Sequence, residues 1–458
     1  MGWVDTLQRA LLPAVLVLLV ALWLGGGVTE DGTSMDEALE LLSLPVLAMA
    51  ASVWLRALPA SRLSRWGMGL ALGIAVLVAV QLLPLPEFLW RLPAARAAIA
   101  AELAQAGVTA PDFRWSLAPA ATEQGLWALL PALACFFAAL ALDAAARRLL
   151  LQVIVGLAAF NVLFAFFQTG LPPDSPLRLY PEADAGFGGL FANTNHQATA
   201  CIVGMVLAVG LAAELHWRAR HADGHAPVVW GYAALAFFFL LATPLSTARA
   251  GVAIALPALA LVVAMTGVLP GHRIWRSKRA LAAALGLCVL VVLGGQAALG
   301  WMAVDLAEEQ RHLFAEMTFA LGRAHAPLGS GVGSFVPVFN AAIPDVMQEA
   351  YFVNHAHNEY VQWWLETGVA GMLILLGVLV LLGMVCRRLL RLQGRGPQAI
   401  LAAAAWVAIV AVLAHSWADY PLRTLSLMAT TAALAGVMLG ALADAAASRH
   451  VDDSSHRH

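Results

Sequence analysis

The chain has 458 residues, of which 61% are hydrophobic and only 12% are charged, and its mean hydropathy is +0.79. This composition excludes an ordinary water-soluble protein, and the formal net charge of −2 argues against a nucleic-acid partner. We therefore interpret the sequence as an all-α polytopic membrane protein, whose helices form one bundle among membrane lipids rather than several soluble domains.

Apolar runs of about twenty residues recur along the chain, and each is long enough to cross a bilayer as a helix. We predict about twelve transmembrane helices, all within a single domain at residues 1–450. The expected spans are 10–27, 37–57, 67–84, 124–142, 149–168, 190–214, 228–244, 250–268, 280–299, 360–385, 398–415 and 423–444. The short polar tail at 451–458 is expected to be disordered.

The basic residues indicate how these spans are oriented. If the N-terminus lies in the cytoplasm, most of the 26 Lys and Arg residues fall in the loops on that side, although the loops on the other side are longer. An excess of positive charge is typical of cytoplasmic loops. The sequence therefore predicts that both termini are cytoplasmic and that the loops near 85–123, 169–189 and 300–359 face outward.

The largest outward loop, 300–359, joins the ninth and tenth predicted helices. Within it, residues 305–323 combine a helical period with mixed charge, which predicts an amphipathic helix on the membrane surface. Three glycines then follow at alternate positions, and this spacing favours tight, unusual backbone. These glycines are Gly329, Gly331 and Gly333.

The segment with the most polar chemistry is 354–368, at the start of the tenth predicted helix. Its candidate site residues are His355, His357, Asn358, Glu359, Tyr360 and Glu366. Ionisable residues in membrane helices mark functional sites, and histidine suits proton transfer near neutral pH. We expect Asn358 to cap the helix, whose N–H groups would then attract an anion. The alternative is that these groups only cap the helix and anchor it at the interface.

Three further segments, 186–197, 246–251 and 415–423, place polar residues at the outer ends of other predicted helices. Their candidate pocket residues are Asn193, Asn195, His196, Arg249, His415, Asp419 and Arg423. Each segment alone is also explained as a glycine-rich cap, a snorkelling arginine or an interhelical turn. Because all of them lie on the same side of the membrane, we predict a pocket open to lipid and water, suited to an anionic amphiphile.

In this order, the segments resemble the O-antigen ligase and O-antigen polymerase superfamily of bacterial membrane glycosyltransferases. The resemblance covers most of the chain after about residue 110, with a ligase-like core at about 185–420. It is carried by Trp115-Ser116-Leu117 with Thr122, by 187–197 and 246–251, by Arg311 with 327–331, by 357–360 with Glu366 and Gly368, and by 415–422. Two departures are Asn193-Thr194-Asn195 in place of Asn-Pro-Asn, and Arg178 as the nearest arginine before that element.

The resemblance implies an enzyme of the bacterial inner membrane that acts at the periplasmic face. Such enzymes take a glycan from undecaprenyl diphosphate and transfer it to an acceptor hydroxyl, without a metal or another cofactor. His357 would be the base that activates the acceptor, with His355 and Glu359 as further catalytic candidates. The arginines implied as ligands of the diphosphate are Arg249, Arg311, Arg423 and Arg178.

The acceptor stays open at this point. A ligase would use a lipid A core, whereas a polymerase would use a second lipid-linked glycan, and a protein is a third possibility. A lipid or glycan transporter without catalysis is an alternative of another class. Transporters usually place polar or broken helices near the middle of the membrane, in paired halves. Here the polar segments gather at one face, which favours a glycosyltransferase.

Overall fold

The computed structural model describes residues 3–29, 32–56, 58–59, 61–108, 112–172, 174–180, 186–222, 227–267, 306–343, 353–392 and 396–455. Over these ranges the chain is helical, and its extended pairing is limited to one antiparallel bridge between Pro84 and Arg114. The helices are α1 (Trp3–Gly25), α2 (Ser34–Trp54), α3 (Arg62–Val80), α4 (Glu87–Trp90), α5 (Ala94–Gln105), α6 (Pro119–Ala141), α7 (Ala144–Thr169), α8 (Thr194–His221), α9 (Val228–Ala242), η1 (Thr243–Ser246), α10 (Arg249–Thr266), α13 (Leu306–His325), α14 (Phe335–Ala342), α16 (Glu359–Leu392), α17 (Pro397–His415), η2 (Pro421–Arg423) and α18 (Leu425–Ser455).

Ten of the described helices are long and apolar enough to cross a membrane, and α1 contains a shorter apolar stretch at Arg9–Gly25. Each expected span other than 280–299 contains a described helix, although the ends of the helices differ from the expected bounds by several residues. The prediction of an all-helical, multi-pass membrane protein is therefore confirmed. The span expected at 280–299 lies outside the described residues.

The C-terminal helix extends further than the sequence analysis predicts. Helix α18 continues to Ser455, so the expected disorder of the tail is wrong for its backbone up to that residue. The physical reason lies in the sequence after Gly440, which contains neither glycine nor proline and begins with several alanines. Alanine has the highest intrinsic helix propensity, and nothing in this stretch interrupts the helix.

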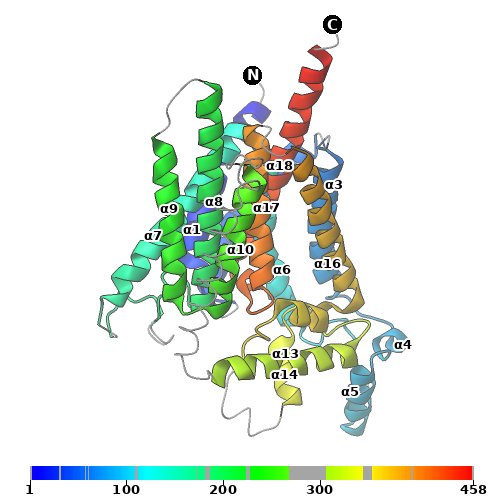
Figure 1. Cartoon of the computed structure of the whole chain (residues 1–458). Helices are drawn as coiled ribbons and strands as arrows, with labels where there is room; N and C mark the ends of the chain where they lie inside the picture. Colours follow the sequence, from blue (N-terminus) through cyan, green and yellow to red (C-terminus); the bar gives the residue numbers. More distant parts are fainter. Residues whose placement is uncertain are drawn as a thin grey trace, which may run out of the picture.

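Both chain termini lie at one end of the helical bundle (Figure 1). Helices α4, α5, α13 and α14 lie at the opposite end, where α13 runs across the bundle rather than along it (Figure 1). We call these the terminal end and the α13 end. The helix expected at 305–323 corresponds to α13, in which Phe314 packs edge-on against Phe339 of α14, with ring centroids 5.8 Å apart.

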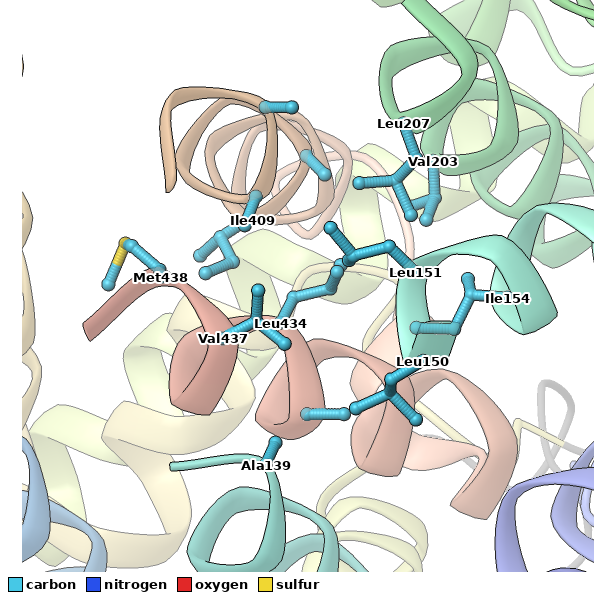
Figure 2. Packing of buried hydrophobic residues seen from close by; sticks show 14 of the residues in the cluster. Ala139, Leu150, Leu151, Ile154, Val203, Leu207, Ile409, Leu434, Val437 and Met438 are labelled. Carbon is cyan, nitrogen blue, oxygen red and sulfur yellow. The ribbon is translucent and has the colours of Figure 1, made fainter. Parts of the chain in front are cut away.

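The interior of the bundle is formed by apolar side chains of α6, α7, α8, α17 and α18. Figure 2 shows Leu151 of α7, Val203 of α8, Ile409 of α17 and Leu434 of α18 converging there. Lipid is as apolar as these side chains, so close packing rather than water exclusion holds such helices together. Small residues permit that packing: a Cβ atom on Gly210 would lie only 2.3 Å from Ala404 Cβ.

Helix α16 is broken at Gly368, where φ is 58° and ψ is −147°. A Cβ atom there would lie 2.2 Å from the carbonyl oxygen of Pro327, so the position requires glycine. The facing loop, 327–334, has the unusual backbone that its alternating glycines predict. Positive φ values occur at Gly329, Gly331 and Gly333. The break separates a short segment of α16 at the α13 end from the long apolar segment that follows it.

Candidate active site

His357 lies in a tight turn directly before α16. Its φ of 49° is one of two positive values among the non-glycine residues that the structure describes. Such backbone costs about 1–3 kcal/mol, and strain of this kind clusters at functional sites. Asn358 caps the helix as predicted, because its Oδ1 accepts hydrogen bonds from the backbone N–H groups of Tyr360 and Val361, at 3.1 and 3.3 Å.

The leading N–H groups of α16 already have partners, so the expectation that they attract an anion is wrong. Glu359 N–H donates to the carbonyl of Ser416 at 2.9 Å, and Gln362 N–H donates to the carbonyl of Asn358 at 3.1 Å. The two groups between them are bound by the Asn358 side chain. A helix end binds anions through unpartnered N–H groups. An anion at this site must therefore be held by side chains.

A fully buried carboxylate, Asp419, faces His357. Its Oδ1 lies 3.2 Å from His357 Nδ1, and its Oδ2 accepts a hydrogen bond from Asn193 Nδ2 at 3.1 Å. Burial raises the pKa of Asp419, but the hydrogen bond from His357 and the charges of nearby imidazoles and Arg311 outweigh burial and bring that pKa below its ordinary value. A carboxylate only accepts hydrogen bonds, so His357 carries its proton on Nδ1 and presents Nε2 as a proton acceptor.

Tyr420 organises the imidazoles around this pair. Its ring centroid lies 4.2 Å from that of His355 and 5.0 Å from those of His196 and His357. Burial, followed by the charge of Asp419, raises the pKa of the Tyr420 hydroxyl to about 12, so the phenol stays protonated. Three candidate histidines from two separate segments therefore pack on one aromatic ring.

His355 lies deeper than His357 and stays neutral. Its side chain is buried, and its Nδ1 lies 3.2 Å from Gln362 Nε2. Burial lowers the pKa of His355 well below its ordinary value, and the positive charge of Arg423 lowers it further. Because an amide N–H only donates, His355 accepts at Nδ1 and carries its proton on Nε2. His357 is the more accessible of the two, with 17% of its side chain exposed.

The remaining polar segments meet the site through α8, α10 and α17. His415 Nδ1 lies 2.7 Å from Thr199 Oγ1, which donates to the carbonyl of Asn195 at 3.1 Å. A Cβ atom on Gly251 would lie 3.7 Å from His415 Cε1. The first turn of α10, which begins at half-buried Arg249, therefore lies beside His415.

The two glutamates at the start of α16 are buried and partnered. Glu359 Oε1 accepts from the backbone N–H of Leu422 at 2.6 Å. Glu366, whose side chain is fully buried, lies 2.9 Å from Arg423 Nη2. The charge of Arg423 is thus matched by a carboxylate inside the protein.

The other candidate arginines differ in their surroundings. Arg311, on α13, lies close enough to Asp419 for its charge to lower the pKa of that carboxyl. Arg178 donates to the carbonyls of Leu171 and Pro172 in its own loop, at 2.7 and 3.0 Å. Of the arginines selected from the sequence, Arg249, Arg311 and Arg423 therefore lie near the histidine cluster, and Arg423 is paired with Glu366.

Residues 234–376 match the sequence model of a protein family described as O-antigen ligase. This part of the chain is similar to an O-antigen ligase domain. The resemblance seen in the sequence is thereby confirmed over these residues. A comparison with curated proteins found no match.

The matched segment supplies only part of the site. The matched residues include Arg249, Arg311 and His357, whereas Asn193 precedes them and Asp419 follows them. The hydrogen bonds of Asp419 to His357 and Asn193 join these three parts of the chain. The site is therefore complete only in the folded chain, because residues before and after the matched segment contribute to it.

Two residues of the site, Tyr420 and Gln362, were not among the candidates selected from the sequence. Both lie in selected segments, but neither residue type indicates a contact with an imidazole. Among the residues that the structure describes, no group of three or more His, Cys, Asp or Glu side chains has the arrangement of a metal site.

Proposed function

We propose that the protein transfers a glycan from undecaprenyl diphosphate to an acceptor hydroxyl at the periplasmic face of the bacterial inner membrane. The observation that carries this proposal is the pairing of His357 with the buried carboxylate Asp419, at the end of the bundle where Arg249 and Arg311 also lie. An oriented base beside arginines is what transfer from a diphosphate needs.

In this mechanism His357 Nε2 takes the proton of the acceptor hydroxyl. The acceptor oxygen attacks the anomeric carbon of the donor sugar, and the bond from that carbon to the diphosphate oxygen breaks. The electron pair leaves with the diphosphate, whose growing negative charge is balanced by Arg249 and Arg311. Asp419 holds the imidazole in the required tautomer and stabilises the imidazolium that forms. The proton then passes to the departing diphosphate or to water.

A cavity supports a substrate that comes from the bilayer. It has a volume of about 520 Å³ and is lined largely by apolar side chains of α3, α6, α16 and α18. At the α13 end, the cavity reaches Glu359, Tyr360 and Arg423, which border the histidine cluster. A hydrocarbon chain in this cavity would keep the attached head group at the level of the site.

Transfer by the purified protein tests the proposed function. With an undecaprenyl-diphosphate glycan and a suitable acceptor, we expect glycosidic product to form at an undiminished rate in EDTA, because arginines balance the charge of the leaving group. Product is measured by mass spectrometry. Activity that disappears in EDTA and returns with Mg²⁺ would contradict the assignment of Arg249 and Arg311. Absence of transfer from every diphosphate-linked donor would refute the function itself.

We favour an O-antigen ligase with a lipid A-core acceptor, and an O-antigen or exopolysaccharide polymerase is the second candidate. A deletion strain separates them. Glycan that accumulates on the carrier, with none on the lipid A core, indicates a ligase. Loss of long chains alone, with single repeats still attached, indicates a polymerase. Transfer to a protein is the less favoured third acceptor.

The proposed orientation places the α13 end in the periplasm and both termini in the cytoplasm. Single cysteines at exposed Arg323 on α13 and exposed His221 at the end of α8 test it, in a background without the four native cysteines. In spheroplasts, a membrane-impermeant maleimide should label the cysteine at 323 and leave the one at 221 unmodified. The reverse pattern would place the histidine cluster in the cytoplasm and exclude the mechanism above.

A further inference from the structure

The break in α16 is held by groups outside the helix. In an unbroken helix, the carbonyls of Leu365 and Glu366 would accept from N–H groups four residues later. Here they accept from the backbone N–H groups of Ser330 and Gly331 in the facing loop, at 2.8 and 2.9 Å. Val369 N–H donates in turn to that loop, at Pro327. The loop 327–334 is therefore hydrogen-bonded to α16 on both sides of the break.

One side chain connects α16 to the loop 327–334 at this break. Gln81 directly follows α3 and is fully buried. Its Nε2 donates to the carbonyl of Glu366 at 3.0 Å, and its Oε1 accepts from the backbone N–H of Val332 at 3.0 Å. Its Oε1 is the partner of the Val332 N–H group, and its Nε2 is a second donor to the Glu366 carbonyl, which also accepts from Gly331, so the side chain is difficult to replace.

Hydrogen bonds continue from the break to the histidine turn. Glu366 Oε1 accepts from Gln362 Nε2 at 3.2 Å. The same Nε2 lies 3.2 Å from His355 Nδ1, while Gln362 Oε1 accepts from the backbone N–H of Ala356 at 3.0 Å. Ala356 is the residue before His357, whose strained backbone requires support from its surroundings. The amide of Gln362 thus fixes the turn that carries the base.

We propose that Gln81 is a positioning residue for His357, acting through the carbonyl of Glu366 and the side chain of Gln362. This inference rests on the proposed function only in assigning His357 as the base. Gln81 itself touches neither the imidazole nor the reacting groups. It holds the first turns of α16 at the angle that places His357 Nδ1 on Asp419. A displacement of about 1 Å in such a group costs on the order of 10²-fold in rate.

The test compares Gln81→Met with a matched control, Gln152→Met. Methionine has nearly the length of glutamine but makes neither hydrogen bond. Gln152 also lies on a membrane helix, where it donates to Tyr232 at 2.9 Å, far along the chain from the site residues. In Gln81→Met we expect kcat to fall about 10- to 100-fold, with the KM for the donor nearly unchanged. The control should keep the kcat of the unmodified protein.

Amide hydrogen exchange supplies a readout that needs no activity. In Gln81→Met, peptides covering 353–362 should exchange faster, while peptides from α8 and α17 should not. Combining Gln81→Met with Gln362→Leu should lower kcat no further than the stronger single change, because both act on one chain of contacts. Unchanged exchange at 353–362, faster exchange throughout the bundle, or additive losses would each overturn the proposal.

A second variant covers failure to fold. An ionised glutamate at this position keeps the acceptor for Val332 N–H, lacks the donor to Glu366 and adds a charge, so Gln81→Glu measured at alkaline pH should give the same exchange pattern. If the unmodified protein transfers no glycan, the proposed function fails, and the exchange measurement still decides whether Gln81 holds the histidine turn.

Discussion

Replacement of His357 by alanine should lower the rate of glycan transfer by about 10²- to 10⁴-fold, the usual contribution of a general base. Binding of the lipid-linked donor should remain nearly intact, because the base acts on the acceptor while the diphosphate is held by arginines. His357→Gln should be equally inactive, since an amide forms hydrogen bonds but cannot take the proton. Single-turnover rates and equilibrium donor binding, measured on the same preparation in lipid nanodiscs, separate these effects.

His221→Ala provides the control for this experiment, because His221 is exposed at the terminal end and should leave the rate unchanged. Substantial transfer by His357→Ala at neutral pH would show that another group is the base. An equal collapse of donor binding would show that the histidine holds the donor instead. In either case Glu359 becomes the next candidate, although its Oε1 is occupied by the backbone N–H of Leu422 and the hydroxyl of Ser416.

The positions of the membrane helices follow from the sequence because hydropathy acts locally. A run of about twenty apolar residues must become a helix in lipid, where every backbone group needs an internal partner. The cap at Asn358 was predictable for the same reason, since capping depends on residues one to three positions away. The disorder expected for 451–458 does not hold for the backbone of 451–455, because polarity alone does not end a helix.

The sequence indicated which segments contribute to the site, but not which of their residues meet. The pairing of His357 with Asp419 joins residues that are 62 positions apart, and the bond from Asn193 to Asp419 joins residues that are 226 apart. No local pattern determines which polar residues at one membrane face will touch. The sequence therefore placed these residues at one face without indicating which of them pair.

Contacts between distant backbone groups explain what the sequence analysis missed. The N–H group of Glu359 was expected to be available to an anion, but the carbonyl of Ser416 occupies it. Gln81 ends an apolar span and resembles an ordinary interfacial amide, yet its partners are backbone atoms of residues 332 and 366. Such partners leave no trace in residue type, because any residue can supply a carbonyl or an N–H group.

Asp419→Asn should reduce transfer by about 10²- to 10⁴-fold, a loss typical when the carboxylate behind a catalytic imidazole is replaced by an amide. The asparagine preserves shape, but its NH₂ group can donate to His357 Nδ1. That contact would move the imidazole proton to Nε2, the atom that must accept the acceptor proton. The variant also loses the negative charge that stabilises the imidazolium. Asp143→Asn is the matched control, since Asp143 caps the start of α7 and asparagine caps equally well.

The pH dependence of the transfer rate, measured together with donor binding and thermal stability, distinguishes loss of the Asp419 charge from loss of the fold in Asp419→Asn. Because the pKa of Asp419 is lowered, its carboxylate stays ionised as the pH falls through the ordinary range of aspartate. A fall in rate toward acid in the unmodified protein should therefore not come from protonation of Asp419. In Asp419→Asn, raising the pH should not restore the rate, because the wrong tautomer persists when the imidazole is neutral. A variant that keeps donor binding and thermal stability but stays slow at every pH supports this role. Recovery of the rate at high pH would contradict this role of the carboxylate.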